Sequence, residues 1–307
     1  MILSICPNPS IDRTIELEQL NVGQLNRVDN KIVTYSGKAL NAAIGVKRLG
    51  GDSYATGFMY YNDGQLFSQR LDNEGVKNTF VWNEGNVRVN YKIVDNRSML
   101  TEINDVGEAV SIEKQQELLD LVSILSKGAS VVIISGSLPK GVSDDYYLKL
   151  CNSVGGNAKK IVDTEGKKLV KTLGAGVYMV KPNLRELEQI VSNRLTSHAD
   201  MIKACNTLID KGAENVLLSL GRDGAILTDG SNAYFCMSEA VAVNSAVGAG
   251  DSMVAAVSVM TERGESKEEI LRSAVAAGTA SIMTPGTNLF YRDKYEEIYS
   301  KIKVQKI

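Results

Sequence analysis

The sequence predicts an α/β protein with a doubly wound, mostly parallel β-sheet flanked by helices, and a small β-sheet that forms a lid. From about residue 110 onward, helix-like and strand-like segments alternate with short connections. The run SVVIIS at residues 130–135 is rich in β-branched residues without alternation, which is typical of a parallel strand buried on both faces. Two earlier segments, 10–37 and 88–105, alternate apolar and polar residues and leave no room for long helices.

The elements are expected in the following order. Residues 1–6 form a buried first strand and no signal peptide, because no charged region precedes the apolar run and Asn8, Pro9 and Asp12 soon follow it. Apolar residues at helical spacing between 118 and 125 predict a helix before the strand at 130–135. Later helices are expected over 144–154, 167–173, 184–191 and 199–212, and later strands over 159–164, 177–182 and 215–220. An antiparallel hairpin at 225–230 and 233–237 precedes two helices that begin near Gly250 and Lys267.

The whole chain, 1–307, is predicted to be a single domain. Its lid is discontinuous in sequence and comes from about 11–36 and 87–106. Repeats, low-complexity tracts and flexible linkers are not apparent.

Composition excludes several classes of function. The net charge of −2 offers no global basic excess for binding nucleic acid. A single histidine, His198, excludes a histidine-based triad or a histidine-rich metal site. The four cysteines have no paired spacing, which is typical of reduced thiols in the cytoplasm. The apolar runs are too short for a membrane span, so we expect a cytoplasmic protein.

The turn Gly248-Ala249-Gly250-Asp251 carries the strongest catalytic signal from the residues alone. Its glycines allow a tight turn where a helix begins, and the first free N–H groups of that helix favour an anion. The amides of Ala249, Gly250 and Asp251 would stabilise a phosphoryl group in transfer. The helix dipole would keep Asp251 ionised as a general base, although an aspartate at this position can also simply cap the helix.

Eight segments, in order, resemble motifs of the PfkB/ribokinase family of carbohydrate kinases. They are CPNPSID, YSGKALNAA, SGSLPKG, VDTEG, KPNLRELE, SLGRDGA, VGAGDSMVA and AAGTASIMTPGT. The resemblance covers nearly the whole chain and implies a ribokinase-like fold. Within the family, the segments are most similar to those of 1-phosphofructokinases and tagatose-6-phosphate kinases.

The resemblance also implies roles for residues on the sugar side. Asp12 and Asn41 would orient the sugar hydroxyls, and Gly37 would form the loop beneath them. Lys38 and Arg88 would hold the phosphate that the sugar already carries. Arg27 and Lys140 are further candidates for that phosphate, although exposed lysines and arginines are more often solvated surface charges.

On the nucleotide side, the resemblance implies binding of ATP and Mg²⁺. Asn183 and Glu186 would organise the magnesium and its waters around the ATP phosphates, and they also fit the spacing of a helix capping box. The remaining nucleotide contacts implied by the motifs are Ser219, Gly221, Gly224, Gly278, Gly286 and Thr287.

The sequence departs from the family pattern in the sugar half. Ser36 and Ala39 replace two glycines of the G-G-K-G motif and add β-carbons to the sugar loop, and Ala39 would be strained if its φ were positive. Asp105 and Glu108 add carboxylates near the expected phosphate pocket.

The expected activity is phosphorylation of fructose 1-phosphate to fructose 1,6-bisphosphate, or of tagatose 6-phosphate. A kinase of an unphosphorylated sugar or nucleoside, and a catalytically weakened sugar-phosphate sensor, stay open as alternatives. Projecting lid strands expose unpaired edges, so a homodimer in which the lids pack together is expected.

Overall fold

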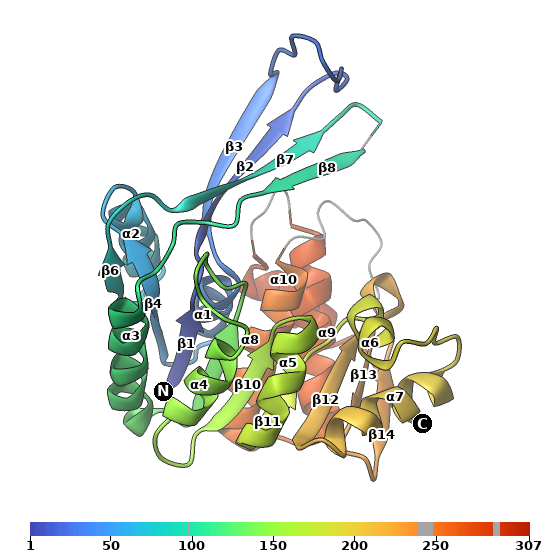
Figure 1. The fold of residues 1–307 in the computed structure, drawn as a ribbon. Helices are drawn as coiled ribbons and strands as arrows, with labels where there is room; N and C mark the ends of the chain where they lie inside the picture. Colours follow the sequence, from blue (N-terminus) through green and yellow to red (C-terminus); the bar gives the residue numbers. More distant parts are fainter. Residues whose placement is uncertain (98, 239–247, 285–288) are drawn as a thin grey trace.

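A computed structural model describes residues 1–97, 99–238, 248–284 and 289–307. Two separate β-sheets organise the chain, a large central sheet and a four-stranded small sheet that projects from it (Figure 1). Helices cover both faces of the central sheet, as the sequence predicts. No helix in these described ranges is long and apolar enough to cross a bilayer.

The central sheet has eleven strands in the order β15-β14-β13-β12-β11-β10-β9-β1-β4-β5, with β6 paired to β4. Neighbouring strands from β12 through to β5 are parallel. The three remaining neighbouring pairs, β12 with β13, β13 with β14 and β14 with β15, are antiparallel. The strands are β1 (Ile2–Cys6), β4 (Ser53–Tyr60), β5 (Lys77–Asn78), β6 (Val81–Asn83), β9 (Val131–Ser135), β10 (Lys159–Asp163), β11 (Val177–Val180), β12 (Ala213–Ser219), β13 (Ala225–Thr228), β14 (Ala233–Cys236) and β15 (Val304–Lys306).

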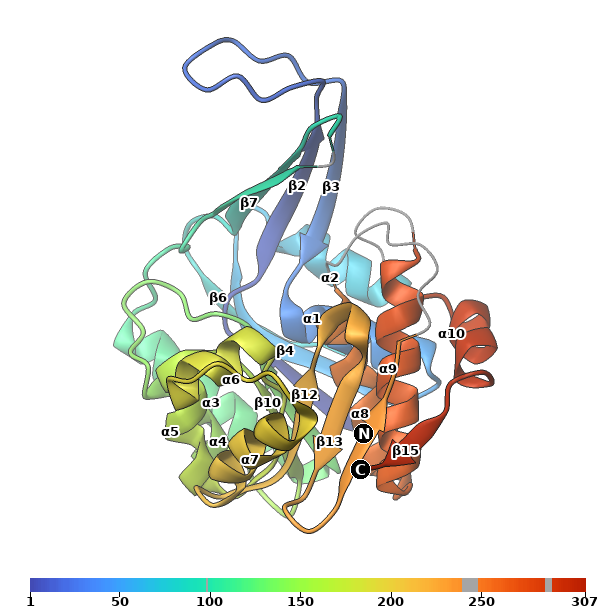
Figure 2. The same ribbon diagram turned by 90° about the vertical axis from the view of Figure 1, so that its right-hand side faces the viewer.

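The helices form one layer on each face of this sheet (Figures 1 and 2). They are α1 (Lys38–Arg48), α2 (Gly64–Asn73), α3 (Ile112–Leu125), α4 (Tyr146–Ser153), α5 (Gly166–Thr172), α6 (Leu184–Val191), α7 (His198–Ile209), α8 (Ala249–Arg263), α9 (Lys267–Ile282) and α10 (Arg292–Tyr299). One apolar core joins α1, α8, α9 and α10 to one face of the sheet, and a second joins helices α3 to α7 to the other face.

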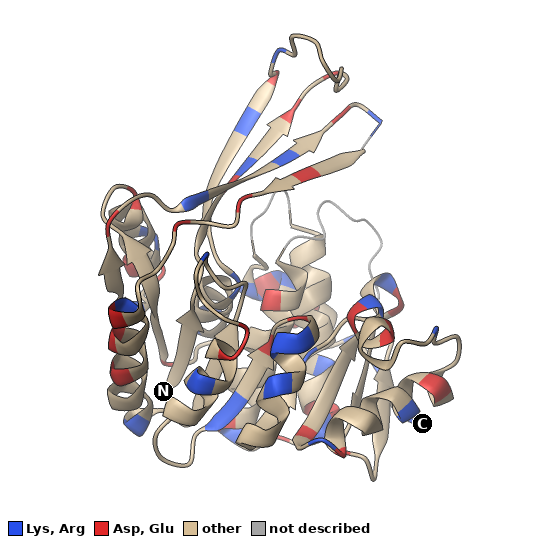
Figure 3. Ribbon diagram, in the orientation of Figure 1, with Lys and Arg blue, Asp and Glu red and all other residues tan. Residues whose placement is uncertain are grey.

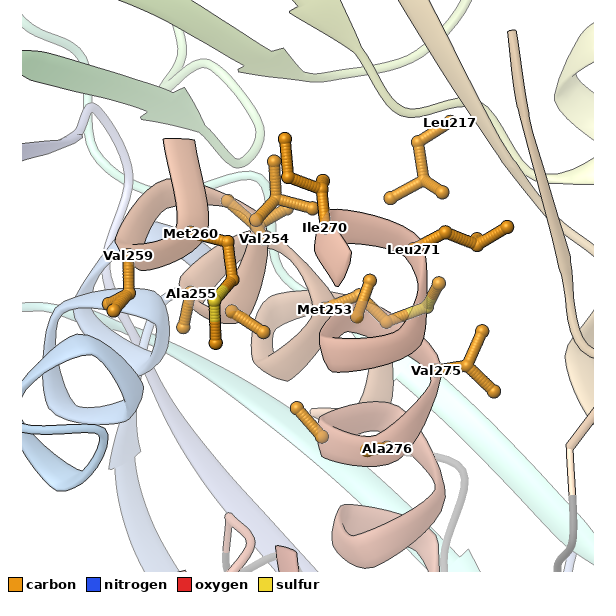
Figure 4. Packing of buried hydrophobic residues seen from close by; sticks show 14 of the residues in the cluster. Leu217, Met253, Val254, Ala255, Val259, Met260, Ile270, Leu271, Val275 and Ala276 are labelled. Carbon is orange, nitrogen blue, oxygen red and sulfur yellow. The ribbon is translucent and has the colours of Figure 1, made fainter. Parts of the chain in front are cut away.

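Strand β9 shows why both layers are needed. Its consecutive residues Ile133 and Ile134 are completely buried but belong to different cores, because successive side chains of a strand point to opposite faces. On the first face, α8 packs against α9 through side chains such as Met253 and Val275 (Figure 4). Burial on both faces explains the apolar runs in the sequence.

The small sheet comes from the two early segments and has the order β3-β2-β7-β8. Its strands are β2 (Ser10–Glu16), β3 (Asn30–Ser36), β7 (Arg88–Val94) and β8 (Leu100–Asn104). Strands β2 and β7 are parallel and distant in sequence, so neither segment builds the sheet alone. The small sheet stands clear of the helical layers in both views, and its strands carry charges of both signs (Figures 2 and 3).

The strand order reverses at β1, which lies between β9 and β4. In open α/β sheets, ligands bind outside the carboxyl ends of the strands at such a switch point. The chain leaves β1 at this end to enter the small sheet and returns to the central domain through α1. The small sheet is therefore anchored where the fold favours a binding site.

Candidate active site

The turn at Gly248 separates two cavities. Ala249 and Gly250 line a cavity of about 440 Å³ beside α9, whereas Gly248 and Asp251 line a second cavity of about 400 Å³ beneath the small sheet. Gly248 precedes α8 with a φ of 82°, and Ala249 is the first residue of the helix. A β-carbon at Gly248 would combine this left-handed backbone with an approach of 3.1 Å to Leu289, so the position requires glycine. A helix N-terminus thus lies between two binding cavities.

Asp251 lies in the first turn of α8 and is only 8% exposed. Asn41 Nδ2 donates a hydrogen bond of 2.8 Å to Asp251 Oδ2 and a second of 3.2 Å to Ser36 Oγ. Burial raises the pKa of Asp251 from 3.8 to about 6, although Lys38 and Asn41 act to lower it. The loss of hydration is the largest of these effects. The resulting pKa suits a general base that works near neutral pH.

Two lysines meet at a buried carboxylate beside this turn. Lys181 Nζ lies 3.2 Å from Asp163 Oδ1, and Lys38 Nζ lies 3.8 Å from Asp163 Oδ2. Burial alone would raise the pKa of Asp163, but the two lysines and hydrogen bonds from Lys181 and Ser135 hold it below 3.8. Asp163, and more weakly Asp251, raise the pKa of Lys38 although burial opposes them. Lys38 therefore stays cationic close to the turn at Gly248.

The cavity beside α9 has largely apolar walls. Its walls include the apolar side chains of Met253, Val275 and Ile282. A β-carbon at Gly278 would lie 2.9 Å from Met253 Cγ, so glycine at this position keeps the slot open. The nucleotide candidates that line this cavity are Asn183, Ser219, Gly221, Gly224 and Gly278.

Asn183 and Glu186 form the capping box that their spacing predicts. Asn183 Oδ1 accepts a bond of 2.8 Å from the Glu186 amide, and Glu186 Oε2 accepts one of 2.9 Å from the Asn183 amide. Together they begin α6. Asn183 reaches the cavity from this helix start, and the charge of Glu186 is close enough to raise the pKa of Lys38.

The second cavity is polar and lies between the small sheet and the carboxyl ends of β1, β9 and β10. Five sugar-side candidates line it together, namely Asp12, Gly37, Lys38, Asn41 and Arg88. Arg88 donates three hydrogen bonds, to the backbone carbonyls of Pro9, Asp105 and Asn8. These bonds fix its guanidinium at the cavity wall. A β-carbon at Gly37 would lie 2.7 Å from Cys6 Sγ, so the loop passes too close to β1 for a larger residue.

Two of the departures from the family pattern, Ser36 and Ala39, are buried. Ala39 is fully buried in the first turn of α1, and Ser192 is the one non-glycine residue with positive φ among those described. The φ of Ala39 is therefore not positive, and the condition for strain at this position is not met. Ser36 lines the second cavity, and its Oγ accepts the second bond from Asn41. Neither Asp105 nor Glu108 lines the second cavity.

Four candidates are not placed in the site. Arg27 is exposed in the loop between β2 and β3, and Lys140 is exposed in a bridge to Ala109; neither lines either cavity. Gly286 and Thr287 lie outside the described residues.

The structure adds residues that the motifs alone do not identify. Strand periodicity from Asp12 and Arg88 would have found the cavity-lining Ser10, Asn90 and Lys92. Asp163 and Lys181 lie within the motifs VDTEG and KPNLRELE, but their contact with Lys38 depends on the order of strands in the sheet. Further lining residues are Asn8, Glu102, Asn104, Gly136, Ser137 and Glu165 in the second cavity, and Arg222, Ser238 and Thr279 in the first.

A helix N-terminus between an apolar-walled cavity and a polar one is an arrangement that suits phosphoryl transfer from a nucleotide. Comparison with known proteins agrees, because residues 7–294 match the pfkB family carbohydrate kinases. The chain belongs to the PfkB family of carbohydrate kinases. It is thus a phosphotransferase with a hydroxyl acceptor, which confirms the predicted enzyme class.

Relatives of this PfkB kinase match it over nearly their full lengths. A 1-phosphofructokinase of Borreliella burgdorferi is 32% identical over 308 residues, which cover 100% of this chain and 99% of the relative. A tagatose-6-phosphate kinase of Staphylococcus epidermidis is 31% identical over 310 residues, covering 99% of each. The crystal structure of phosphofructokinase-2 from Escherichia coli with substrates and products superimposes with a TM-score of 0.91, at 30% identity and 98% coverage of both chains. The ribokinase-like fold and the resemblance to this branch are confirmed.

Proposed function

We propose that this PfkB kinase transfers the γ-phosphoryl group of ATP to a hydroxyl of a ketohexose phosphate. Fructose 1-phosphate is the first candidate substrate and tagatose 6-phosphate the second. The observation that carries the proposal is the position of the turn at Gly248, whose residues line the nucleotide cavity on one side and the polar cavity on the other.

The chemical step follows from that geometry. Asp251 accepts the proton of the sugar hydroxyl while the hydroxyl oxygen bonds to the γ-phosphorus. The bond between that phosphorus and the oxygen bridging it to the β-phosphorus breaks, and ADP leaves with the electron pair. Amides of Ala249, Gly250 and Asp251 donate to the phosphoryl oxygens, where a helix N-terminus favours negative charge.

Lys38 takes part in this step in our proposal. It pairs with Asp163 and lies within electrostatic reach of Asp251, which places its charge near the group in transfer. Arg88 remains the candidate for the phosphate that the sugar already carries, since three of its five donors are used on carbonyls and two are left.

The residues fit a magnesium ion held mainly by the nucleotide. Glu186 lines neither cavity, but it adjoins Asn183 through the capping box formed by its Oε2, and its other oxygen would face a hydrated ion. Mg²⁺ commonly binds through one or two carboxylates together with substrate phosphates. Among the described residues no cluster of three or more His, Cys, Asp or Glu side chains is arranged for a metal. When bound, the ion would neutralise phosphate charge.

We also propose a homodimer through the back face of the small sheet, which is the row Val33, Arg13, Tyr91 and Ile103. Val33 is 41% exposed and Ile103 is 57% exposed, although a sheet normally buries its apolar face. The opposite face of the sheet lines the polar cavity. The four cysteines are buried and form no disulfide bond among the described residues, which further supports a cytoplasmic location.

The test is a coupled ADP-release assay across hexose phosphates, unphosphorylated sugars and nucleosides. We expect turnover with a ketohexose phosphate and little with ribose or adenosine. Turnover of the unphosphorylated compounds alone would replace the proposed substrate class. A ligand-induced rise in melting temperature without any ADP release would instead identify a sensor.

A further inference from the structure

Strand β7 carries a lysine in the polar cavity that no motif explains. Arg88, Asn90 and Lys92 alternate along the strand, lie on one face of the small sheet and line the cavity together. Lys92 is only 6% exposed. Lysine is almost never buried without a partner, so its contacts indicate its role.

The partner of Lys92 is Asp12, on the neighbouring strand β2. Lys92 Nζ lies 2.9 Å from Asp12 Oδ2. Asn90 Nδ2 donates to Asp12 Oδ1 at 3.0 Å, and Ser10 Oγ donates to the same oxygen at 2.9 Å. All four side chains are buried, and all four line the cavity.

These contacts leave the Asp12 carboxylate with one unoccupied acceptor site. A carboxylate has about four acceptor sites, two on each oxygen. Ser10 and Asn90 occupy both sites of Oδ1, and Lys92 occupies one site of Oδ2. The remaining acceptor site lies on Oδ2, next to the Lys92 ammonium, which has three donors and uses one of them for Asp12. A fixed acceptor and a fixed donor therefore stand side by side at the cavity wall.

Stability of the fold does not account for this pair. Apolar residues of similar volume commonly stabilise a protein as well as a buried ion pair does, because desolvation offsets the attraction between the charges. A binding role explains why both charges are retained beneath the small sheet.

We propose that Lys92 is a positioning and specificity-determining residue that, with Asp12, holds two adjacent hydroxyls of the sugar. Asp12 Oδ2 accepts a hydrogen bond from one hydroxyl, and Lys92 Nζ donates to the oxygen of the next. The inference rests on the proposed function, since it supposes that the polar cavity binds the sugar. Because the acceptor and donor are both fixed, the pair discriminates between sugars that differ in configuration at these carbons.

The decisive experiment is a double-mutant cycle of Lys92→Met, Asp12→Asn and the combined variant. We expect Lys92→Met to raise the KM for the accepted sugar phosphate tenfold or more, with a smaller loss of kcat and an unchanged KM for ATP. In the Asp12→Asn background the same change should add less than threefold, because without the Asp12 carboxylate the Lys92 ammonium is no longer held beside the second hydroxyl. A substrate analogue that lacks one of the two hydroxyls should bind more weakly than the sugar phosphate itself. This loss of affinity should be smaller in Lys92→Met than in the wild type.

Lys267→Met is the matched control, because Lys267 also pairs with a partly buried aspartate, Asp229, but lies outside both cavities. Its KM for sugar should not change. Additive effects in the cycle, or an equal rise in the KM for ATP, would overturn the inference. If either single variant leaves a buried charge unpaired and fails to fold, the combined variant, which buries no charge at this pair, is compared with the wild type for its KM for the sugar phosphate and its KM for ATP.

Calorimetric titration of each variant with fructose 1-phosphate and with tagatose 6-phosphate separates this inference from the proposed function. Wild-type binding without ADP release would refute the kinase proposal while the binding cycle still tests Lys92. Turnover with an additive cycle would refute the role of Lys92 alone. Failure of the wild type to bind either sugar phosphate would overturn both.

Discussion

The fold buries the carboxylate of Asp251, although this carboxylate must be charged to act as the proposed general base. The rise of its pKa from 3.8 to about 6 means that ionisation costs the folded protein about 3 kcal/mol more than the unfolded chain. Because the folded pKa is raised, the contribution of Asp251 to the free energy of unfolding is fully present below pH 3.8. This contribution is lost as the pH rises from 3.8 to about 6. In the proposed mechanism, the site thus holds its general base at the expense of stability.

Replacement of Asp251 by asparagine should separate activity from stability. Asp251→Asn is expected to lower kcat by roughly 10²- to 10⁴-fold, because no group then takes the hydroxyl proton. The same variant should melt at a higher temperature than the wild type at pH 7.5 and at nearly the same temperature at pH 4. Steady-state ADP release and thermal melts at both pH values check this, with Asp120→Asn on the surface as the control. Wild-type turnover by a variant that still binds ATP would refute the assignment of the base.

The pH profile of the wild type should show the same group. Protonated Asp251 cannot accept a proton, so kcat/KM for the sugar is expected to fall tenfold for each pH unit below about 6 and to level off above it. Initial rates at saturating ATP and constant ionic strength measure the profile. A profile that stays flat down to pH 5 would contradict the raised pKa of Asp251.

At the scale of elements, two helix starts have the same cap and different surroundings. Asn183 begins α6 and Ser197 begins α7, each with a complete capping box, but only Asn183 lines the nucleotide cavity. Asn183→Ala and Ser197→Ala should each lower the free energy of unfolding by about 1 kcal/mol. The KM for ATP should rise in Asn183→Ala alone. Denaturant unfolding and ATP kinetics of the two variants provide the comparison, and an equal KM in both would leave Asn183 with a capping role only.

The elements differ in how far the sequence predicts them. Strands such as β9 and β12 are visible because burial on both faces leaves an uninterrupted apolar run, and most predicted bounds agree with the structure within a few residues. Helices α1 and α2 and strand β4 are not among the predicted elements. In α1, eight of the eleven residues are buried, so no polar face marks the helical period.

The candidate site, too, could be predicted only in part from the sequence. Motif residues such as Asp12, Asn41 and Asp251 come together as predicted because each motif follows the carboxyl end of a strand or begins a helix. The meeting of Lys38 with Asp163 and Lys181 is not foreseeable, since it depends on β10 lying next to β11 and on α1 returning over the same edge. Local periodicity predicts faces, whereas contacts across the sheet require its strand order.

For the whole molecule, the exposed back face of the small sheet predicts its assembly. Ile103→Lys should convert the dimer to a monomer at micromolar concentration, because it would replace an exposed apolar side chain of the proposed interface by a charge without a partner there. Ile124→Lys is the matched control, since Ile124 is 65% exposed on α3 and outside the small sheet. Sedimentation equilibrium measures both variants, and a wild type that is monomeric at these concentrations would refute the dimer.

The packing of α1 against α8 also bears on how the chain is made. A β-carbon at Gly45 would lie 2.7 Å from Ala255 Cβ, and the bond from Asn41 to Asp251 closes the same seam across 210 positions of sequence. While the ribosome is still synthesising the middle of the chain, α1 can pack against β1 and β4, but its side that faces α8 is uncovered and open to aggregation. Catalytic competence therefore arrives last, only after the C-terminal helices have emerged, and incomplete chains should depend on chaperones for solubility.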